Sequence, residues 1–115
     1  MALPVFDETV LEKDLDAMAN NARTATDFLK ALGHEGRLMI LCYLADGERS
    51  VTELEDLLSA RQPAVSQQLA RLRIEGLVDA RRDGKTIYYS IADDRTRKAV
   101  EFLYNMFCRD SATPC

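Results

Sequence analysis

The chain has 115 residues and a formal net charge of −4, a length that fits one domain with a modest core, which would gain from pairing with a second copy. Its acidic amino-terminal stretch and its longest apolar run, residues 38–45, predict neither a secretory signal nor a membrane span of roughly 20 residues, so we expect a cytoplasmic protein. Three cysteines without a Cys-x-x-Cys pattern, beside one histidine, argue against a disulfide scaffold and a zinc finger.

The first predicted element is an amphipathic region over residues 9–32. Thr9 and Glu12 form a capping-box pattern, and apolar residues then recur at helical spacing as far as Gly33, a typical helix stop. A pair of weak helix formers in the middle leaves open whether this region is one bent helix or two.

Two further helices are predicted in the middle of the chain. Residues 35–45 are apolar nearly all round, which is typical of a central core helix. Ser50 and Glu53 form a second capping box, which predicts the start of a short helix over residues 51–58. The three residues that follow make a turn of the length that joins the two helices of a helix-turn-helix.

The helix predicted over residues 62–75 is the segment best suited to contact a partner. Pro63 fits its first position, and an apolar residue at i, i+4 and i+7 gives it one narrow core-facing stripe. Its free face carries side chains of the types that hydrogen-bond base edges and phosphates in a DNA major groove. These candidate DNA-binding residues are Gln62, Ser66, Gln67, Gln68 and Arg71.

A β-hairpin is predicted from two β-rich runs, residues 78–82 and 86–91, on either side of the turn dipeptide Asp83-Gly84. Arg81, Arg82 and Lys85 crowd its tip, where they could reach DNA phosphates or a minor groove, although a solvated turn is also often charged. Residues 61–85 hold six basic and three acidic residues, which makes this the only positive segment of an acidic chain. The elements together predict a mainly α fold with a small β-hairpin, a winged helix-turn-helix.

A last helix is expected over residues 93–108, with Asp93 and Asp94 at the end where a helix favours acidic groups. Its apolar surface exceeds what one small domain would cover. We therefore expect a homodimer whose interface is formed by helices from both termini. Residues 1–115 are interpreted as a single domain, with flexible tails over residues 1–8 and 109–115.

Three blocks of the sequence resemble the arsenic-repressor (ArsR/SmtB) family of dimeric winged helix-turn-helix repressors: GHEGRLMILCYL, RSVTELEDLL and QPAVSQQLARLRIEGLVDARRDGKTIYYSI. The resemblance covers about residues 22–108. It implies a repressor that binds a double-stranded DNA operator, not an enzyme, with the polar residues of the 62–75 helix facing the operator.

Cys42 and Cys108 resemble those of the sulfide- and persulfide-responsive subgroup, which includes BigR, SqrR and HlyU and releases DNA when its two thiols are bridged by sulfur. By this resemblance, Cys42 and Cys108 are the redox-sensing pair and Tyr104 lines their pocket. The inducer is then a persulfide or another oxidised sulfur species, or an oxidant. Cys115 has no assigned counterpart.

The chain departs from the metal sensors of the family. Residues 51–58 contain no Cys-x-Cys and the last helix contains no histidine, so we expect neither a metal site nor a cofactor. His34 is expected to cap a helix or to pack.

Two alternatives to the sulfur switch stay open. A cysteine inside the apolar run around Cys42 is often a small buried hydrophobe, so the chain could be a metal-independent winged-helix regulator with structural cysteines. A winged helix can also serve as a protein-interaction module. A thiol enzyme is disfavoured, because no basic partner for a nucleophilic cysteine is found near it in the sequence.

Overall fold

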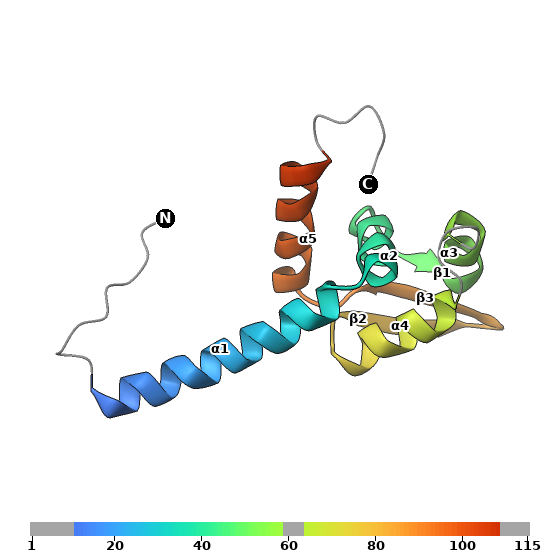
Figure 1. The fold of residues 1–115 in the computed structure, drawn as a ribbon. Helices are drawn as coiled ribbons and strands as arrows, with labels where there is room; N and C mark the ends of the chain where they lie inside the picture. The colour runs from blue at the N-terminus through green and yellow to red at the C-terminus, as the bar shows by residue number, and fades with distance from the viewer. Residues whose placement is uncertain (1–10, 59–63, 109–115) are drawn as a thin grey trace. The chain divides into compact units, whose positions relative to one another are not determined.

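The computed structural model describes residues 11–58 and 64–108. Its elements are, in chain order, α1 (Glu12–Leu32), α2 (Glu35–Ala45), β1 (Arg49–Ser50), α3 (Val51–Leu58), α4 (Val65–Ile74), β2 (Val78–Asp83), β3 (Thr86–Ile91) and α5 (Asp94–Phe107) (Figure 1). They form two compact units, Met1–Lys30 and Ala31–Cys115. No helix in the described ranges is both long and apolar enough to cross a membrane.

The first unit contains most of α1. The sequence left open whether this region is one helix or two, and α1 is one continuous helix. Apart from the half-buried Phe28, its described residues are exposed, including Leu15 and Met18 on the predicted apolar stripe. The predicted cap at Thr9 lies outside the described residues. This helix therefore presents apolar side chains that nothing within its own unit covers.

The core of the second unit is built around α2, whose Ile40, Leu41 and Leu44 are completely buried. Helix α2 contacts α3, α4, α5 and β3, as the nearly all-round apolar pattern predicted (Figure 1). Its start is fixed by His34, whose Nδ1 accepts hydrogen bonds from the backbone N–H groups of Gly36 and Arg37. The expected capping role of His34 is confirmed.

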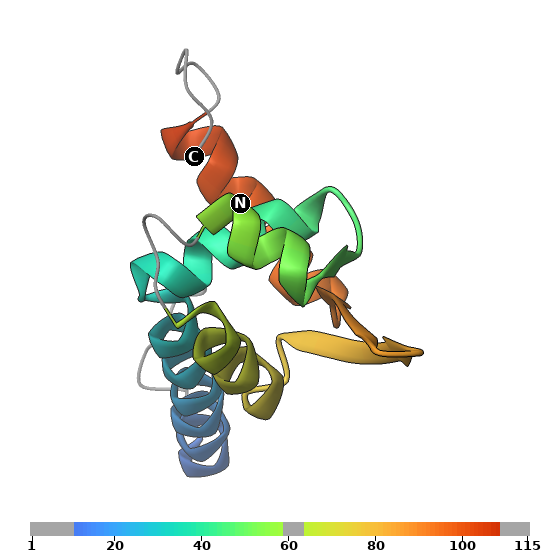
Figure 2. The ribbon, with the colours of Figure 1, turned by 90° about the vertical axis from the view of Figure 1, so that its right-hand side faces the viewer.

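The sheet has three antiparallel strands in the order β1-β3-β2. Strand β1 was not predicted. The hairpin turn lies one residue later than the predicted Asp83-Gly84, because Asp83 pairs with Thr86 and leaves Gly84 and Lys85 as the turn. Gly84 has a φ of 64°, which a glycine adopts at no steric cost at the first turn position. Figure 2 shows this hairpin extending away from the helices of the second unit.

The predicted first-position residue Pro63 lies outside the described residues, and helix α4 begins at Val65, later than the predicted start at residue 62. The reason lies at Ala64, which has a left-handed backbone (φ 66°, ψ 37°) and stands at the cap position without a side-chain hydrogen bond. A left-handed residue interrupts helical geometry. The predicted stripe of Val65, Leu69 and Leu72 is buried, and the chain leaves the helix through Gly76, with a φ of 81°.

Candidate DNA-binding surface and thiol cavity

Helices α3 and α4 form the helix-turn-helix. The predicted capping box holds the start of α3: the Ser50 N–H donates to Glu53 Oε1 and the Glu53 N–H donates to Ser50 Oγ, both at 3.1 Å. Leu54 and Leu58 of α3 are buried, and α3 contacts α4. The turn and the candidate DNA-binding residue Gln62 lie outside the described residues.

On α4, the structure separates the predicted DNA-binding residues into two groups. Ser66, Gln67 and Arg71 are exposed, and Arg71 forms an ion pair with Glu75 one turn later, with 3.2 Å between Nε and Oε1. Gln68 is half-buried, and its Oε1 accepts a hydrogen bond of 3.3 Å from Arg37 Nη1. The side-chain oxygen of Gln68 is thus turned toward α2.

Arg37 connects α2 with the end of α1 and with α4, which we call the reading head because it carries the residues predicted to contact bases. Its Nε donates to the carbonyl of Ala31 at 2.7 Å, at the end of α1, while its Nη1 reaches Gln68 on α4. The same residue belongs to the first turn of α2, whose cap is His34. Arg37 was not among the predicted site residues, since a hydrogen bond between residues 31 positions apart leaves no local pattern.

The basic residues of the wing, the β2–β3 hairpin, are not equivalent. Arg81 binds both carboxylate oxygens of Glu48 and lies over the Tyr88 ring, with 4.8 Å from its Cζ to the ring centroid. The hydrogen bond from Arg81 lowers the pKa of Glu48, and the same bond raises that of Arg81. The side chains of Arg82 and Lys85 are exposed and have no ionic or hydrogen-bonding partner within the part of the chain that the structure describes.

A cavity of about 500 Å³ lies between the last part of α2 and α5. It contains the predicted sensing residue Cys42 and the predicted pocket residue Tyr104, which are 62 positions apart in the sequence but are brought together by the packing of α2 against α5. Its lining residues are Cys42, Tyr43, Ala45, Asp46, Val100, Glu101, Tyr104 and Asn105. The lining residues of each helix recur at helical spacing, so they share one face of that helix. This spacing identifies them once α2 and α5 are known to pack against each other.

Cys42 carries a free thiol and is half-buried, and burial raises its pKa above the ordinary value. Removing a thiolate from water disfavours its charge, so Cys42 is mainly a neutral thiol at neutral pH.

Cys108 is not among the residues that line the cavity. It is buried at the end of α5, where its N–H donates to the Tyr104 carbonyl at 2.8 Å. Cys108 is disulfide-bonded, whereas Cys42 is free. The predicted link between Cys42 and Cys108 is therefore not formed here and stays a prediction. Cys115 also lies outside the described residues.

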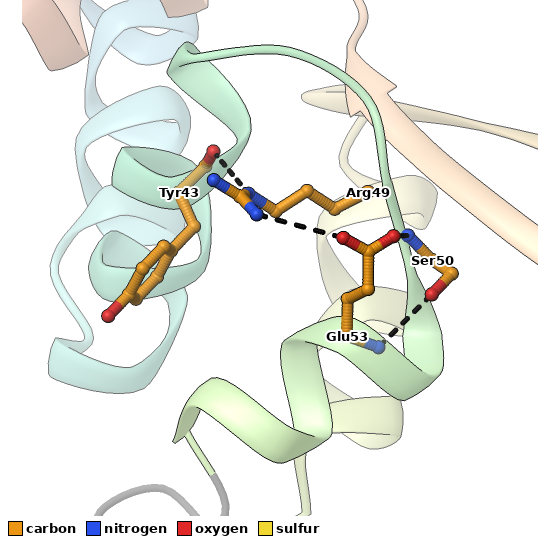
Figure 3. A network of polar contacts seen from close by, with 4 residues as sticks. All are labelled: Tyr43, Arg49, Ser50 and Glu53. Carbon is orange, nitrogen blue, oxygen red and sulfur yellow. Dashed lines mark hydrogen bonds and ion pairs between the residues drawn. The ribbon is translucent and has the colours of Figure 1, made fainter.

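The cavity is connected to the helix-turn-helix by the polar network in Figure 3. Arg49 Nε donates to the carbonyl of Tyr43 at 3.1 Å, and its guanidinium lies 5.6 Å from the centroid of the Tyr43 ring. The other side of Arg49 forms an ion pair with Glu53 of the α3 capping box, at 3.7 Å. Arg49 thus links Tyr43, which lines the cavity, to Glu53 at the start of α3.

In the described ranges, no group of three or more His, Cys, Asp or Glu side chains could hold a metal ion.

Two packed helices with a buried stripe, followed by a hairpin with basic residues at its tip, define a winged helix-turn-helix, a class of DNA-binding domain. Residues 34–80 match the family model described as bacterial regulatory protein, arsR family. The chain belongs to this family, and it is a regulator rather than an enzyme.

Curated relatives support this assignment over most of the chain. It is 48% identical over 108 residues to the biofilm growth-associated repressor of Agrobacterium fabrum, a match that spans 88% of this chain and 92% of that protein. It is 40% identical over 96 residues to the transcriptional activator HlyU of Vibrio cholerae, across 84% of this chain and 89% of the relative. The resemblance to the subgroup that includes BigR and HlyU is confirmed.

Solved structures of HlyU and BigR have a fold similar to that of this chain. Reduced HlyU from Vibrio cholerae superimposes with a TM-score of 0.76 at 39% identity, covering 82% of this chain and 99% of that one. The repressor BigR from Xylella fastidiosa gives a TM-score of 0.70 at 39% identity, covering 86% and 98% of the two chains.

Proposed function

We propose that this protein is a homodimeric repressor that binds a double-stranded DNA operator and releases it when reactive sulfur or oxidation links Cys42 to Cys108. The observation that carries the sensing part is the free thiol of Cys42, which lines the same cavity as Tyr104 between α2 and α5. The similarity to BigR and HlyU supports the DNA-binding part.

The exposed residues of the reading head and the wing supply the DNA contacts. Ser66 and Gln67 are exposed on α4, where they would meet base edges or phosphates. Arg82 and Lys85 place two uncompensated positive charges at the wing. Their attraction to phosphate is independent of sequence, so the specificity of the repressor rests on α4.

A second copy would cover apolar surface that the single chain exposes. On α5, Phe102 and Phe107 are 63% and 73% exposed, and Leu15 on α1 is 47% exposed. The fragment of Mb0332 from Mycobacterium bovis, a structural neighbour with a TM-score of 0.63, is described as a homodimeric winged helix-turn-helix. We therefore propose that residues 9–32 and 93–108 form the dimer interface. We also propose a cytoplasmic location, as expected of a DNA-binding regulator.

The sulfur chemistry starts from the reduced form of both cysteines. Cys42 attacks the outer sulfur of a persulfide RSSH, which forms a Cys42 persulfide and releases RSH. Cys108 then attacks the inner sulfur of that persulfide, which forms the Cys42–Cys108 disulfide and releases H₂S. If Cys108 has also become a persulfide, the product is a trisulfide. Each step oxidises protein thiol and reduces the sulfur of the donor, so no further oxidant is required.

The link acts on DNA binding only if it fits the released state better than the bound state. The helices that carry the two thiols join the core to the proposed dimer interface, so linking them would change the separation of the two reading heads. A coupling of about 1 to 3 kcal/mol would weaken DNA binding roughly 5- to 150-fold.

The test combines cysteine variants with mass spectrometry after treatment with glutathione persulfide. Cys42→Ser and Cys108→Ser should each retain DNA binding and lose the response, whereas Cys115→Ser should respond nearly as the parent does. The parent should gain a mass that corresponds to an internal link between Cys42 and Cys108. If Cys115→Ser abolishes the response and Cys42→Ser does not, the sensing pair is assigned wrongly.

One observation favours a regulator with structural cysteines. Burial raises the pKa of Cys42, which lowers its reactivity at neutral pH. In that case, the parent and Cys42→Ser would bind DNA equally before and after the persulfide treatment. A protein-interaction module would instead fail to bind any duplex at low salt.

A further inference from the structure

The cavity that contains Cys42, which we call the thiol cavity, is lined by acidic residues. Two acidic residues line it, Asp46 at the end of α2 and Glu101 on α5. Tyr104 and Asn105 are polar but uncharged, and none of the lining residues within residues 11–58 and 64–108 is basic. Among the described residues, the charged side chains that line the space beside Cys42 are therefore acidic.

The end of α2 adds to this negative potential. Asp46 is the carboxyl-terminal cap of α2, and the last turn of that helix contains no basic residue. The aligned peptide groups of a helix place a partial negative charge at this end. Cys42 and Ala45, which belong to the last turn, line the cavity together with the cap.

The nearby cations do not reverse this sign. Arg97 Nη1 donates to the Ala45 carbonyl at 2.8 Å, where it offsets the end of the helix, but Arg97 does not line the cavity. Arg49 is held between the Tyr43 carbonyl and Glu53. Lys98 precedes Glu101 by one turn of α5 and is exposed to solvent. The carboxylates remain the charged groups at the wall.

We infer that the cavity selects its sulfur donors by charge: it favours neutral and cationic donors at Cys42 and disfavours anionic ones, with Asp46 and Glu101 as the specificity-determining residues. The biological role of this selectivity rests on the proposed function. The selectivity itself is a property of the reaction at Cys42 and can be measured without DNA. At about 6 Å in water-like surroundings, one pair of unit charges changes local concentration roughly three-fold. Two carboxylates should thus separate a cation from an anion by more than 10-fold at low salt.

The probes are two methanethiosulfonates that share one reactive group and differ in charge, one carrying ethyltrimethylammonium and the other ethylsulfonate. The Cys42 thiolate attacks the sulfenyl sulfur, a mixed disulfide forms, and methanesulfinate leaves with the electron pair. The full-length chain with Cys108→Ser and Cys115→Ser isolates Cys42. Rates are followed by intact mass and divided by the rates with 2-mercaptoethanol, which removes intrinsic differences between the reagents.

We expect the normalised ratio of cation to anion rates at Cys42 to exceed 10 at low salt and to fall toward 1 in molar salt. Asp46→Asn and Glu101→Gln should each lower the ratio roughly three- to ten-fold, and the double variant should remove most of it. Glu35→Gln is the matched control, because Glu35 lies in the first turn of the same helix and does not line the cavity. A ratio near 1 in the parent, or one that both cavity variants leave unchanged, would overturn the inference.

A second arm separates this inference from the proposed function. The parent protein on DNA is treated with cysteamine persulfide, which is cationic at its amine, or with glutathione persulfide, which is anionic. Faster release by the cationic donor supports both ideas. Release at equal rates, together with a thiosulfonate ratio near 1, overturns the selectivity and leaves the sensing function intact. A high thiosulfonate ratio without release by either donor supports the selectivity and overturns the sensing function.

Discussion

Glu48 and Arg81 form a two-point ion pair that ties the wing to the loop between α2 and β1, with hydrogen bonds of 2.7 and 3.1 Å. The guanidinium of Arg81 also stacks on Tyr88 across the hairpin. Its charge is thus compensated within the chain, whereas the charges of Arg82 and Lys85 are not. Of the three wing residues predicted to contact DNA, two are available for it in this structure.

This difference predicts how each wing residue affects the salt dependence of DNA binding. Arg82→Ala should weaken binding to all sequences and make the slope of log K against log salt shallower by about 0.9, because one phosphate contact is lost. Lys85→Ala should act in the same way, and Arg81→Ala should change the slope less. Fluorescence anisotropy of a labelled duplex over a range of salt concentrations measures all three slopes.

Glu48→Gln is the matching variant, since it leaves Arg81 without its anionic partner and should make the slope steeper. If Arg81→Ala flattens the slope as much as Arg82→Ala does, the ion pair opens on DNA. Three unchanged slopes would mean that the wing does not touch DNA.

Asp93 stabilises the start of α5 in a pH-dependent way. Hydrogen bonds from the Thr96 hydroxyl and N–H lower the pKa of Asp93, so its folded pKa lies below the unfolded one. The contribution is therefore present above about pH 4, the unfolded value, and is lost as the pH falls through the folded pKa. Asp93→Ala should lower the free energy of unfolding by about 1 kcal/mol at pH 7.

Urea denaturation at pH 7 and at pH 3 measures this effect. Asp93→Asn should retain much of the cap and show a weaker loss of stability in acid than the parent. Asp94→Asn serves as the control, because Asp94 lies beside the cap but in the first helical turn. Equal acid sensitivity of the parent and Asp93→Asn would contradict the assignment.

The proposed dimer predicts that a charge on the apolar face of α5 separates the subunits. Phe107→Glu replaces a side chain that is 73% exposed in the single chain, so it should leave the fold intact while disfavouring contact with a second copy. Sedimentation velocity at micromolar concentration should show a dimer for the parent and a monomer for the variant. Glu55→Lys, an exposed site on α3 outside the proposed interface, is the control. A monomeric parent would rule out the dimer.

Ala64 predicts a stabilising substitution. Its left-handed backbone costs about 1 to 2 kcal/mol for a residue with a Cβ, whereas the greater freedom of glycine in the unfolded chain costs about 0.4 to 1 kcal/mol. Ala64→Gly should therefore raise the free energy of unfolding by up to about 1 kcal/mol. Ala70→Gly, at an exposed position inside α4, should lower it by about 1 kcal/mol. If both variants lose stability equally in urea, the left-handed conformation of Ala64 is wrong.

Local patterns predicted most of the fold. Residues 35–45, 51–58 and 86–91 have the predicted bounds, because an all-round apolar run, a capping box and a β-rich segment each act within one element. Strand β1 was missed because it has two residues, which is too short for a period to be recognised. The start of α4 was misplaced because proline preference could not reveal the backbone conformation of Ala64.

The site was less predictable, because its key relationships join distant residues. The Glu48–Arg81 pair and the Arg37–Gln68 hydrogen bond each connect separate elements, and no local rule indicates them. Residue types alone placed Arg81 and Gln68 among DNA contacts, although both have partners within the chain. In contrast, Tyr104 was placed beside Cys42 by family resemblance, and the cavity contains both.

The exposed apolar side chains of α1 and α5 bear on how the stability of the fold depends on protein concentration. If these residues are covered only when two chains meet, mass action links folding to association, and the midpoint of thermal unfolding rises with protein concentration. A promoter that this regulator controls would then be sensitive to the amount of regulator in two ways, through occupancy of the operator and through the fraction of chains that persist in the folded state.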